Sequence, residues 1–163
     1  MKYFEVTKEL SFCAGHRVPS HSGKCRNAHG HGYLLKVTAR GPLVDAIGTS
    51  SEGMVVDFSE LKKAMVEEVE NRFDHVFIKA CTDRIFNRYD QVLIEANKGN
   101  ELLAGRWQVE DVGIVQEIRM IPTAENLAYI IFKLLEQRLN NADTRVTKVQ
   151  LWETPTSMAE YSE

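Results

Sequence analysis

Three of the five histidines in this chain, His16, His29 and His31, are spaced so that they could share one metal ion. His29 and His31 are two residues apart, so in an extended chain both side chains point to one face, roughly 6–7 Å apart. His16 ends an alternating apolar segment and can reach the same face if the two segments pair antiparallel. Three neutral imidazoles form an open zinc site, with a fourth position left for water or substrate. A His-x-His pair in a loop is also common as plain polar surface, and imidazoles bind iron and other divalent ions as well.

A thiol and a possible proton-transfer pair accompany these histidines. Cys25 lies four residues before His29 in a loop rich in His, Ser and Gly, where a thiolate could act as a general base. The alternative for Cys25 is an inert buried thiol. Asp74 precedes His75, and a carboxylate can hold an imidazole in one tautomer. Neighbours on a strand point to opposite faces, so this pairing needs a turn or a partner from another subunit; the alternative for Asp74 is a helix-end cap.

Composition narrows the class of protein. The chain has 163 residues and a formal net charge of −3 from 20 basic and 23 acidic side chains, which argues against a nucleic-acid partner. No apolar stretch is long enough for a membrane span, and the N-terminal residues lack a signal-peptide core. The three cysteines, Cys13, Cys25 and Cys81, are an odd number without a disulfide spacing, so we expect free thiols in the cytoplasm.

The first half of the chain predicts two strands and a helix. Residues 3–16 and 31–40 alternate apolar and polar side chains, as strands with one buried face do. The segment 17–30 between them is longer than a hairpin turn requires, and long ordered loops tend to be functional. A helix with either Asp57 or Ser59 as its cap is predicted to begin near Asp57–Ser59 and to end before Phe73.

The second half predicts a helix and a strand after a less regular region. Within 80–118, two apolar runs flank the turn-like segment 97–100 and suggest an extra hairpin. Thr123 is predicted to cap a helix that ends near residue 140, and 146–153 reads as a strand. We therefore expect one α+β domain over 1–163, with two helices packed on one face of an antiparallel sheet.

The segment Cys25 to His31 resembles the Cys-x3-His-Gly-His motif of the 6-pyruvoyltetrahydropterin synthase family. Its spacing is that of the bacterial 6-carboxytetrahydropterin synthase branch, whereas the pyruvoyl-forming branch usually has two more residues before the His-Gly-His. Five more segments resemble the family's motifs in the same order: Phe12–Arg17, Met54–Leu61, Phe73–His75, Pro122–Asn126 and Glu153–Thr154.

The resemblance implies the tunnelling fold (T-fold), in which trimers or hexamers build a barrel with active sites at subunit interfaces. It implies zinc as the cofactor and 7,8-dihydroneopterin triphosphate as the substrate. In the carboxy branch this substrate yields 6-carboxy-5,6,7,8-tetrahydropterin, acetaldehyde and triphosphate, an early step toward queuosine and related deazapurines.

The resemblance also implies roles for individual residues. Cys25 would be the general base, with Asp74 and His75 as the second proton-transfer element. Glu153 would anchor the pterin through two parallel hydrogen bonds, and Thr123 could contact the pterin besides capping its helix. The cations nearest the metal motif could receive the triphosphate: Arg17, Lys24 and Arg26.

The sequence departs from the family in residues 76–79, in the length of 80–118 and in Gly15, and none of these departures removes a proposed catalytic group. Two other functions stay open. One is the pyruvoyl-forming reaction, and the other is a non-catalytic zinc-binding oligomer of the same fold.

Overall fold

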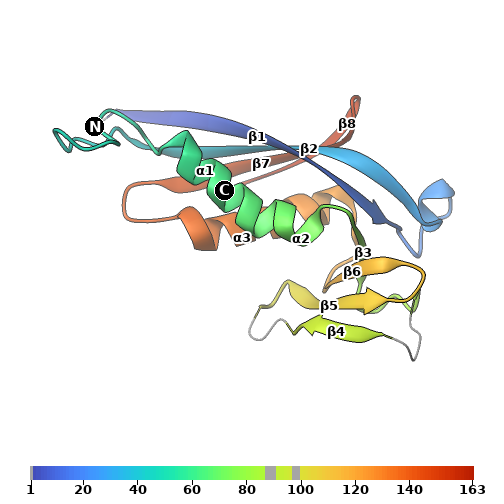
Figure 1. Cartoon of the computed structure of the whole chain (residues 1–163). Helices are drawn as coiled ribbons and strands as arrows, with labels where there is room; N and C mark the ends of the chain where they lie inside the picture. Colours follow the sequence, from blue (N-terminus) through green and yellow to red (C-terminus); the bar gives the residue numbers. More distant parts are fainter. Residues whose placement is uncertain (1, 87–90, 97–99) are drawn as a thin grey trace.

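The computed structural model describes residues 2–86, 91–96 and 100–163 and contains one eight-stranded sheet. The strand order is β4-β5-β6-β3-β1-β2-β7-β8, and the long helices lie on one face of it (Figure 1). The strands are β1 Tyr3–His16, β2 His29–Pro42, β3 Val76–Ala80, β4 Val92–Glu95, β5 Leu103–Val109, β6 Gly113–Ile118, β7 Arg145–Thr154 and β8 Ser157–Ser162. The helical segments are η1 Lys24–Arg26, α1 Phe58–Met65, η2 Val66–Glu70, α2 Asn71–Phe73 and α3 Ala124–Leu139.

The two alternating segments at the start of the chain pair antiparallel as β1 and β2, as predicted. Their register runs to the end of both strands, where His16 lies opposite His29 and Ala14 lies opposite His31. Alternate residues of both strands, such as Phe12 and Leu35, are buried under the helices. Because this register is unbroken, the histidines at the strand ends lie on the same face of the sheet as the buried apolar side chains.

The sheet is mixed, whereas the sequence favoured an antiparallel one. β3 pairs parallel with both of its neighbours, β1 and β6. A helical segment connects β2 to β3, and a crossover of that length allows a parallel neighbour where a short hairpin turn does not. The α+β class and the two helices on one face are confirmed.

The first helix begins where predicted and continues further than predicted. The Asp57 carboxylate accepts a hydrogen bond from the Ser59 amide at 2.7 Å, which caps α1. The chain then passes through a π-helical turn, η2, and stays helical to Phe73 in α2. Val69 and Phe73 are fully buried, so packing against the sheet carries the helix past the point where its apolar period weakens.

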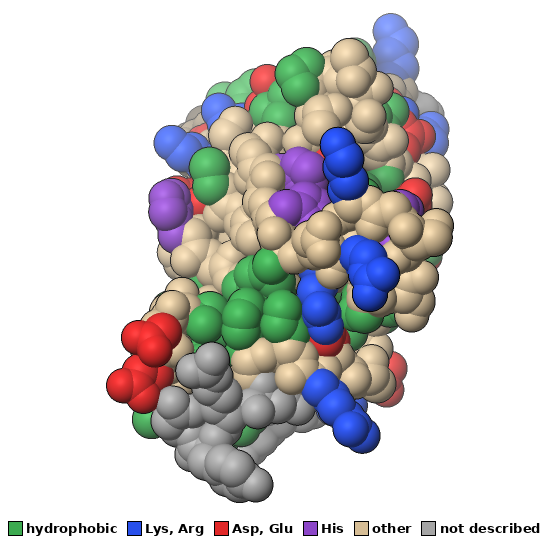
Figure 2. All heavy atoms as spheres, turned by 90° about the vertical axis from the view of Figure 1, so that its right-hand side faces the viewer, with side chains coloured by type: hydrophobic (Ala, Val, Ile, Leu, Met, Phe, Trp, Pro, Cys, Tyr) green, Lys and Arg blue, Asp and Glu red, His purple; other side chains and the backbone are tan. Residues whose placement is uncertain are grey.

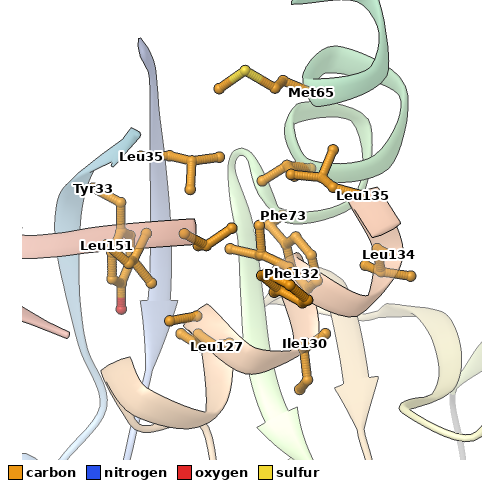
Figure 3. Close-up of a cluster of buried hydrophobic side chains, with 14 of the residues drawn as sticks. Tyr33, Leu35, Met65, Phe73, Leu127, Ile130, Phe132, Leu134, Leu135 and Leu151 are labelled. Atoms are coloured by element: carbon orange, nitrogen blue, oxygen red, sulfur yellow. The ribbon is translucent and has the colours of Figure 1, made fainter. Parts of the chain in front are cut away.

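The core lies between the helices and the sheet (Figure 3). Figure 3 shows Met65 and Phe73 from the first helical stretch and Leu127 and Phe132 from α3 on the same side of the sheet as Leu35 and Leu151, in one buried cluster. Thr123 caps α3, since its hydroxyl oxygen accepts a hydrogen bond from the Asn126 amide at 3.4 Å. Phe12 and Tyr33 belong to the same core, which therefore holds the end of β1 and the beginning of β2, where the histidines lie.

The region 80–118 extends the sheet beyond β3. The predicted hairpin is present, because the run 92–94 lies in β4 and the run 102–104 overlaps the start of β5. The two runs do not face each other, since Val92 lies opposite Gln108. β6, which pairs with β5, was not predicted. Residues 97–99 of that turn lie outside the described residues. Arg106 of β5 donates to the Asn71 carbonyl at 2.6 Å and so caps the end of the first helix.

None of the helices in the described ranges has the length and apolar character to span a bilayer.

Candidate metal centre and active site

The structure brings His16, His29 and His31 together at the junction of β1 and β2. One ring nitrogen from each histidine lies within 4.8 Å of the others. The ring centroids are 4.5 Å apart for His16 and His29, 5.1 Å for His16 and His31, and 5.0 Å for His29 and His31. The strand register produces this meeting, because His16 and His29 are cross-strand partners and His31 follows on the same face.

Backbone carbonyls fix the tautomers of two of these rings. His16 Nδ1 lies 2.6 Å from the Pro122 carbonyl oxygen, and His29 Nδ1 lies 2.7 Å from the Asn27 carbonyl oxygen. A carbonyl only accepts, so each Nδ1 carries the hydrogen and each Nε2 keeps its lone pair. Hydrogen bonds of this kind orient metal-binding histidines in known sites.

His16 itself shows that these residues fit a metal ion. The residue is 2% exposed, and within the described part of the chain its Nε2 is buried without a hydrogen-bond partner. Burial lowers the pKa of His16, which favours the neutral imidazole that binds metal. A buried acceptor without a partner is costly unless a donor or a cation meets it. The cluster therefore offers three imidazole nitrogens to one ion, in the ligand set of an open zinc site.

Glu153 lies beside the cluster at the end of β7. Its Oε1 is 3.7 Å from His16 Nε2 and accepts a hydrogen bond from the Tyr33 hydroxyl at 3.4 Å. Burial, with a contribution from the nearby Glu153 charge, raises the pKa of Tyr33 far above its usual value, so its hydroxyl stays protonated and can donate. The carboxylate is 23% exposed and is therefore open to a ligand lying over the three histidines.

Cys25 lies on η1 in the loop between β1 and β2. Its thiol is exposed and does not belong to the group of donor atoms formed by the three histidines. The loop folds back on itself, since the Val18 amide donates to the Cys25 carbonyl at 2.8 Å. Cys25 is thus held by the same loop whose two ends carry His16 and His29, without being one of the clustered donors.

Asp74 and His75 meet through a turn, one of the two arrangements that their adjacency requires. His75 has a φ of 54°, in the left-handed region, and its Nδ1 lies 2.8 Å from Asp74 Oδ2. Asp74 Oδ1 accepts from the Cys13 amide at 2.8 Å, and this hydrogen bond lowers the pKa of Asp74. The Asp74 carboxylate thus attaches the Asp74–His75 pair to the backbone of β1 at Cys13.

The imidazole of His75 is open to its surroundings. Its side chain is 80% exposed. It borders a shallow depression of about 400 Å³ that Cys13, Gly15 and His31 also line. An imidazole this exposed in one copy is available to a ligand held partly by another molecule.

Basic side chains lie near the histidines at this end of the molecule (Figure 2). Lys24 and Arg26 are exposed on η1. Arg17 is not a free cation, because its Nε and Nη2 donate to the Asp83 carboxylate at 2.7 and 2.5 Å. Thr123 caps α3 and directly follows Pro122, whose carbonyl contacts His16.

Three residues that contribute to the site were not predicted: Tyr33, Asp83 and Pro122. Tyr33 had a signal, since it shares the parity of His29 and His31 on the same strand. Asp83 and Pro122 are distant in sequence from their partners Arg17 and His16. Pro122 belongs to a segment that resembles a family motif, but nothing in that segment predicts its contact with His16, and no local pattern marks Asp83.

Comparisons with known proteins find relatives over nearly the whole chain. The family model described as 6-pyruvoyl tetrahydropterin synthase matches residues 5–163. A Haemophilus influenzae protein named 6-carboxy-5,6,7,8-tetrahydropterin synthase is 33% identical over 160 residues, covering 98% of this chain and 99% of its own. A protein of the same name from Aquifex aeolicus is 32% identical over 181 residues, covering 98% of each chain.

Solved structures show the same fold. An uncharacterized protein from Wolinella succinogenes matches with a TM-score of 0.70 and 26% identity, over 100% of this chain and 99% of that one. The 6-pyruvoyl tetrahydropterin synthase of Plasmodium vivax matches with a TM-score of 0.66 and 20% identity, again over 100% of this chain and 99% of that one. With a family model matched over nearly its whole length, the chain belongs to the 6-pyruvoyl tetrahydropterin synthase family.

Proposed function

We propose that this protein converts 7,8-dihydroneopterin triphosphate, with uptake of water, into 6-carboxy-5,6,7,8-tetrahydropterin, acetaldehyde and triphosphate. The observation that carries the proposal is the cluster of three histidines, two of them oriented by backbone carbonyls, with the Glu153 carboxylate at its edge. The carboxy product is favoured over the pyruvoyl one by the names of the H. influenzae and A. aeolicus relatives. The three-residue spacing between Cys25 and His29 favours the same branch.

His16, His29 and His31 would hold a zinc ion through one ring nitrogen each. For His16 and His29 this nitrogen is Nε2, because a backbone carbonyl accepts the Nδ1 hydrogen. Bound there, zinc supplies Lewis-acid activation of the hydroxyl groups on the substrate's side chain. Imidazole-only ligation and an open fourth position suit zinc among the divalent metals.

Glu153 would bind the pterin ring. Its carboxylate can accept two parallel hydrogen bonds, from the 2-amino group and a ring N–H of the pterin. Tyr33 donates to Oε1 of this carboxylate and so holds it in place, while the second oxygen stays available. Since Glu153 lies beside His16, a ring held there directs its side chain over the three histidines. Thr123, next to Pro122, lies close enough in the chain to contribute to the same subsite.

Cys25 would take a proton from the substrate's side chain as general base. Its thiol is accessible, and a bound cation nearby favours the thiolate. Asp74 accepts the Nδ1–H of His75, which leaves His75 Nε2 free to exchange a proton with the substrate. The low pKa of Asp74 keeps that carboxylate charged, and its charge stabilises the imidazolium when His75 is protonated.

A second copy of the chain would complete each site, in a trimer or hexamer. The support is the exposure of His75, which is oriented by Asp74 and yet open to a neighbouring molecule. If Cys25 and His75 act from different copies, mixing Cys25→Ala and His75→Ala proteins under exchange conditions restores part of the activity. If both act within one copy, the mixture stays inactive.

The reaction is tested by incubating the purified, zinc-loaded protein with 7,8-dihydroneopterin triphosphate and identifying the products by mass. Acetaldehyde with a carboxypterin supports the proposal. A pyruvoyl product would assign the chain to the other branch of the family. An inactive protein that still binds zinc would be a non-catalytic oligomer.

A further inference from the structure

Asp83 is a buried acidic residue that the reaction outlined above does not use. It lies just after β3, in the extension of the sheet, and is 5% exposed. Its two carboxylate oxygens take two hydrogen bonds from one guanidinium: Oδ2 accepts from Arg17 Nε at 2.7 Å and Oδ1 from Arg17 Nη2 at 2.5 Å. Two-point contacts of this kind fix geometry as well as charge.

The surrounding chain holds Asp83 in place before it meets Arg17. Its amide donates to the Ala80 carbonyl at 2.9 Å, and its Oδ1 accepts the Ile85 amide at 3.0 Å. The buried Lys79 ammonium donates to the Asp83 carbonyl at 2.9 Å and pairs with Glu117 of β6 at 3.1 Å. The guanidinium of Arg17 lowers the pKa of Asp83, so the contact is between two charged groups. Asp83 is therefore a rigid anchor on the sheet.

Arg17 connects this anchor to the loop that carries Cys25. It directly follows His16, and the next residue, Val18, donates its amide to the Cys25 carbonyl at 2.8 Å. A short chain of contacts thus runs from Asp83 through Arg17 and Val18 to Cys25. The loop of residues 17–28 is attached to strands at both ends, and the side chains in its middle are exposed. The contact between Arg17 and Asp83 therefore adds a fixed point to a loop that has little burial of its own.

We infer that Asp83 is a positioning residue, which clamps Arg17 and thereby holds the Cys25 loop in its place beside the three histidines. The inference gives the 80–118 region a role in the reaction, and its kinetic part rests on the proposed function. Releasing the clamp leaves every proposed catalytic group present but loosens the loop that places Cys25. A misplacement of about 1 Å lowers turnover by on the order of 100-fold, so kcat falls more than substrate binding does.

The test is Asp83→Asn, measured by hydrogen exchange and by kinetics on the full-length zinc-loaded protein. Peptides covering 17–28 are expected to exchange roughly tenfold faster or more, the value of one charge-assisted hydrogen bond. The kcat on 7,8-dihydroneopterin triphosphate is expected to fall by about 10- to 100-fold, with KM changed by less than about threefold. Arg17→Lys keeps both charges and loses the two-point geometry, so it gives the same direction of change even if the Asn variant folds poorly.

A matched control is Glu67→Gln, which breaks another arginine–carboxylate pair. Arg138 donates to Glu67 Oε2 from Nε at 3.3 Å and from Nη2 at 3.1 Å, between helical segments that carry no proposed catalytic residue. This variant should change neither the exchange of 17–28 nor kcat.

A double variant tests whether Arg17 and Asp83 act through their mutual contact or independently of each other. Arg17→Met combined with Asp83→Asn should be no slower than the slower single variant, because both changes remove the same contact. Unchanged exchange of 17–28 in Asp83→Asn would overturn the inference, and so would faster exchange with an unchanged kcat. If the wild-type protein does not turn over the pterin, the proposed function fails, while the exchange measurement still decides whether the clamp exists.

Discussion

Zinc is expected to stabilise the wild-type protein against heat, because its three ligands are brought together only in the folded chain. His16, His29 and His31 present donor atoms within 4.8 Å of one another, while His16 lies 13 positions before His29 in the sequence. A ligand that binds only the folded state adds about 2.7 kcal/mol at a free concentration 100 times its Kd. For a chain of this size, each kcal/mol raises Tm by about 2–4 °C. The expected rise in Tm is therefore about 5–11 °C.

The assay is a thermal melt of metal-stripped protein with and without added zinc, accompanied by elemental analysis. His29→Ala removes one of the three donors, and it should lose most of the rise in Tm and the stoichiometric zinc. His21→Ala is the matched control, because it changes a histidine in the same loop that lies outside the cluster and is exposed. It should keep the full rise.

An equal rise in Tm for the wild type and His29→Ala would refute the reasoning, since the ion would then be held elsewhere. A wild-type protein that neither binds zinc nor shifts its Tm would refute it as well. Iron or another divalent ion producing the shift in place of zinc would keep the ligand set and change the metal.

Three further predictions concern single residues. Cys25→Ala should keep stoichiometric zinc and lose activity by about 10²- to 10⁴-fold, because Cys25 is proposed as a base and not a ligand; zinc loss in this variant would contradict the assignment. Thr123→Ala should lower the free energy of unfolding by about 1 kcal/mol in urea titrations, and an unchanged midpoint would show that the cap of α3 contributes nothing. The pKa of Asp83 is lowered from its usual 3.8, so its contribution to stability is complete above that pH and is lost as the pH falls through the lower folded-state value. Asp83→Asn should remove this part of the acid dependence, and acid titrations that superimpose for both proteins would contradict it.

Local patterns in the sequence predicted the elements that present the histidines. The alternation of apolar and polar residues in β1 and β2 predicts which side chains face the core. When the two strands pair antiparallel, the same alternation places His16, His29 and His31 on one face. The caps at Asp57 and Thr123 were readable because a capping side chain bonds an amide two or three residues away. Each of these patterns involves residues only a few positions apart, so a short window of the sequence contains the whole pattern.

The sequence was less informative where packing decides the structure. The helical path through η2 to Phe73 has a weak apolar period, and burial of Val69 and Phe73 maintains it. The parallel position of β3 beside β1 depends on how the crossover helix lies on the sheet. β6 and β8 are strands because a neighbouring strand offers them hydrogen bonds, and pairing of that kind is not written in either strand alone.

The residue types and their spacing state which chemistry is available to this protein: three imidazoles of shared parity, a thiol four residues before one of them, and an acid–imidazole pair. How these groups are held depends on contacts across the fold. The Pro122 carbonyl that orients His16 is 106 residues away, Tyr33 and Glu153 are 120 apart, and Arg17 and Asp83 are 66 apart. Contacts between such distant residues form only when the core brings their strands together, so no window of sequence contains both partners.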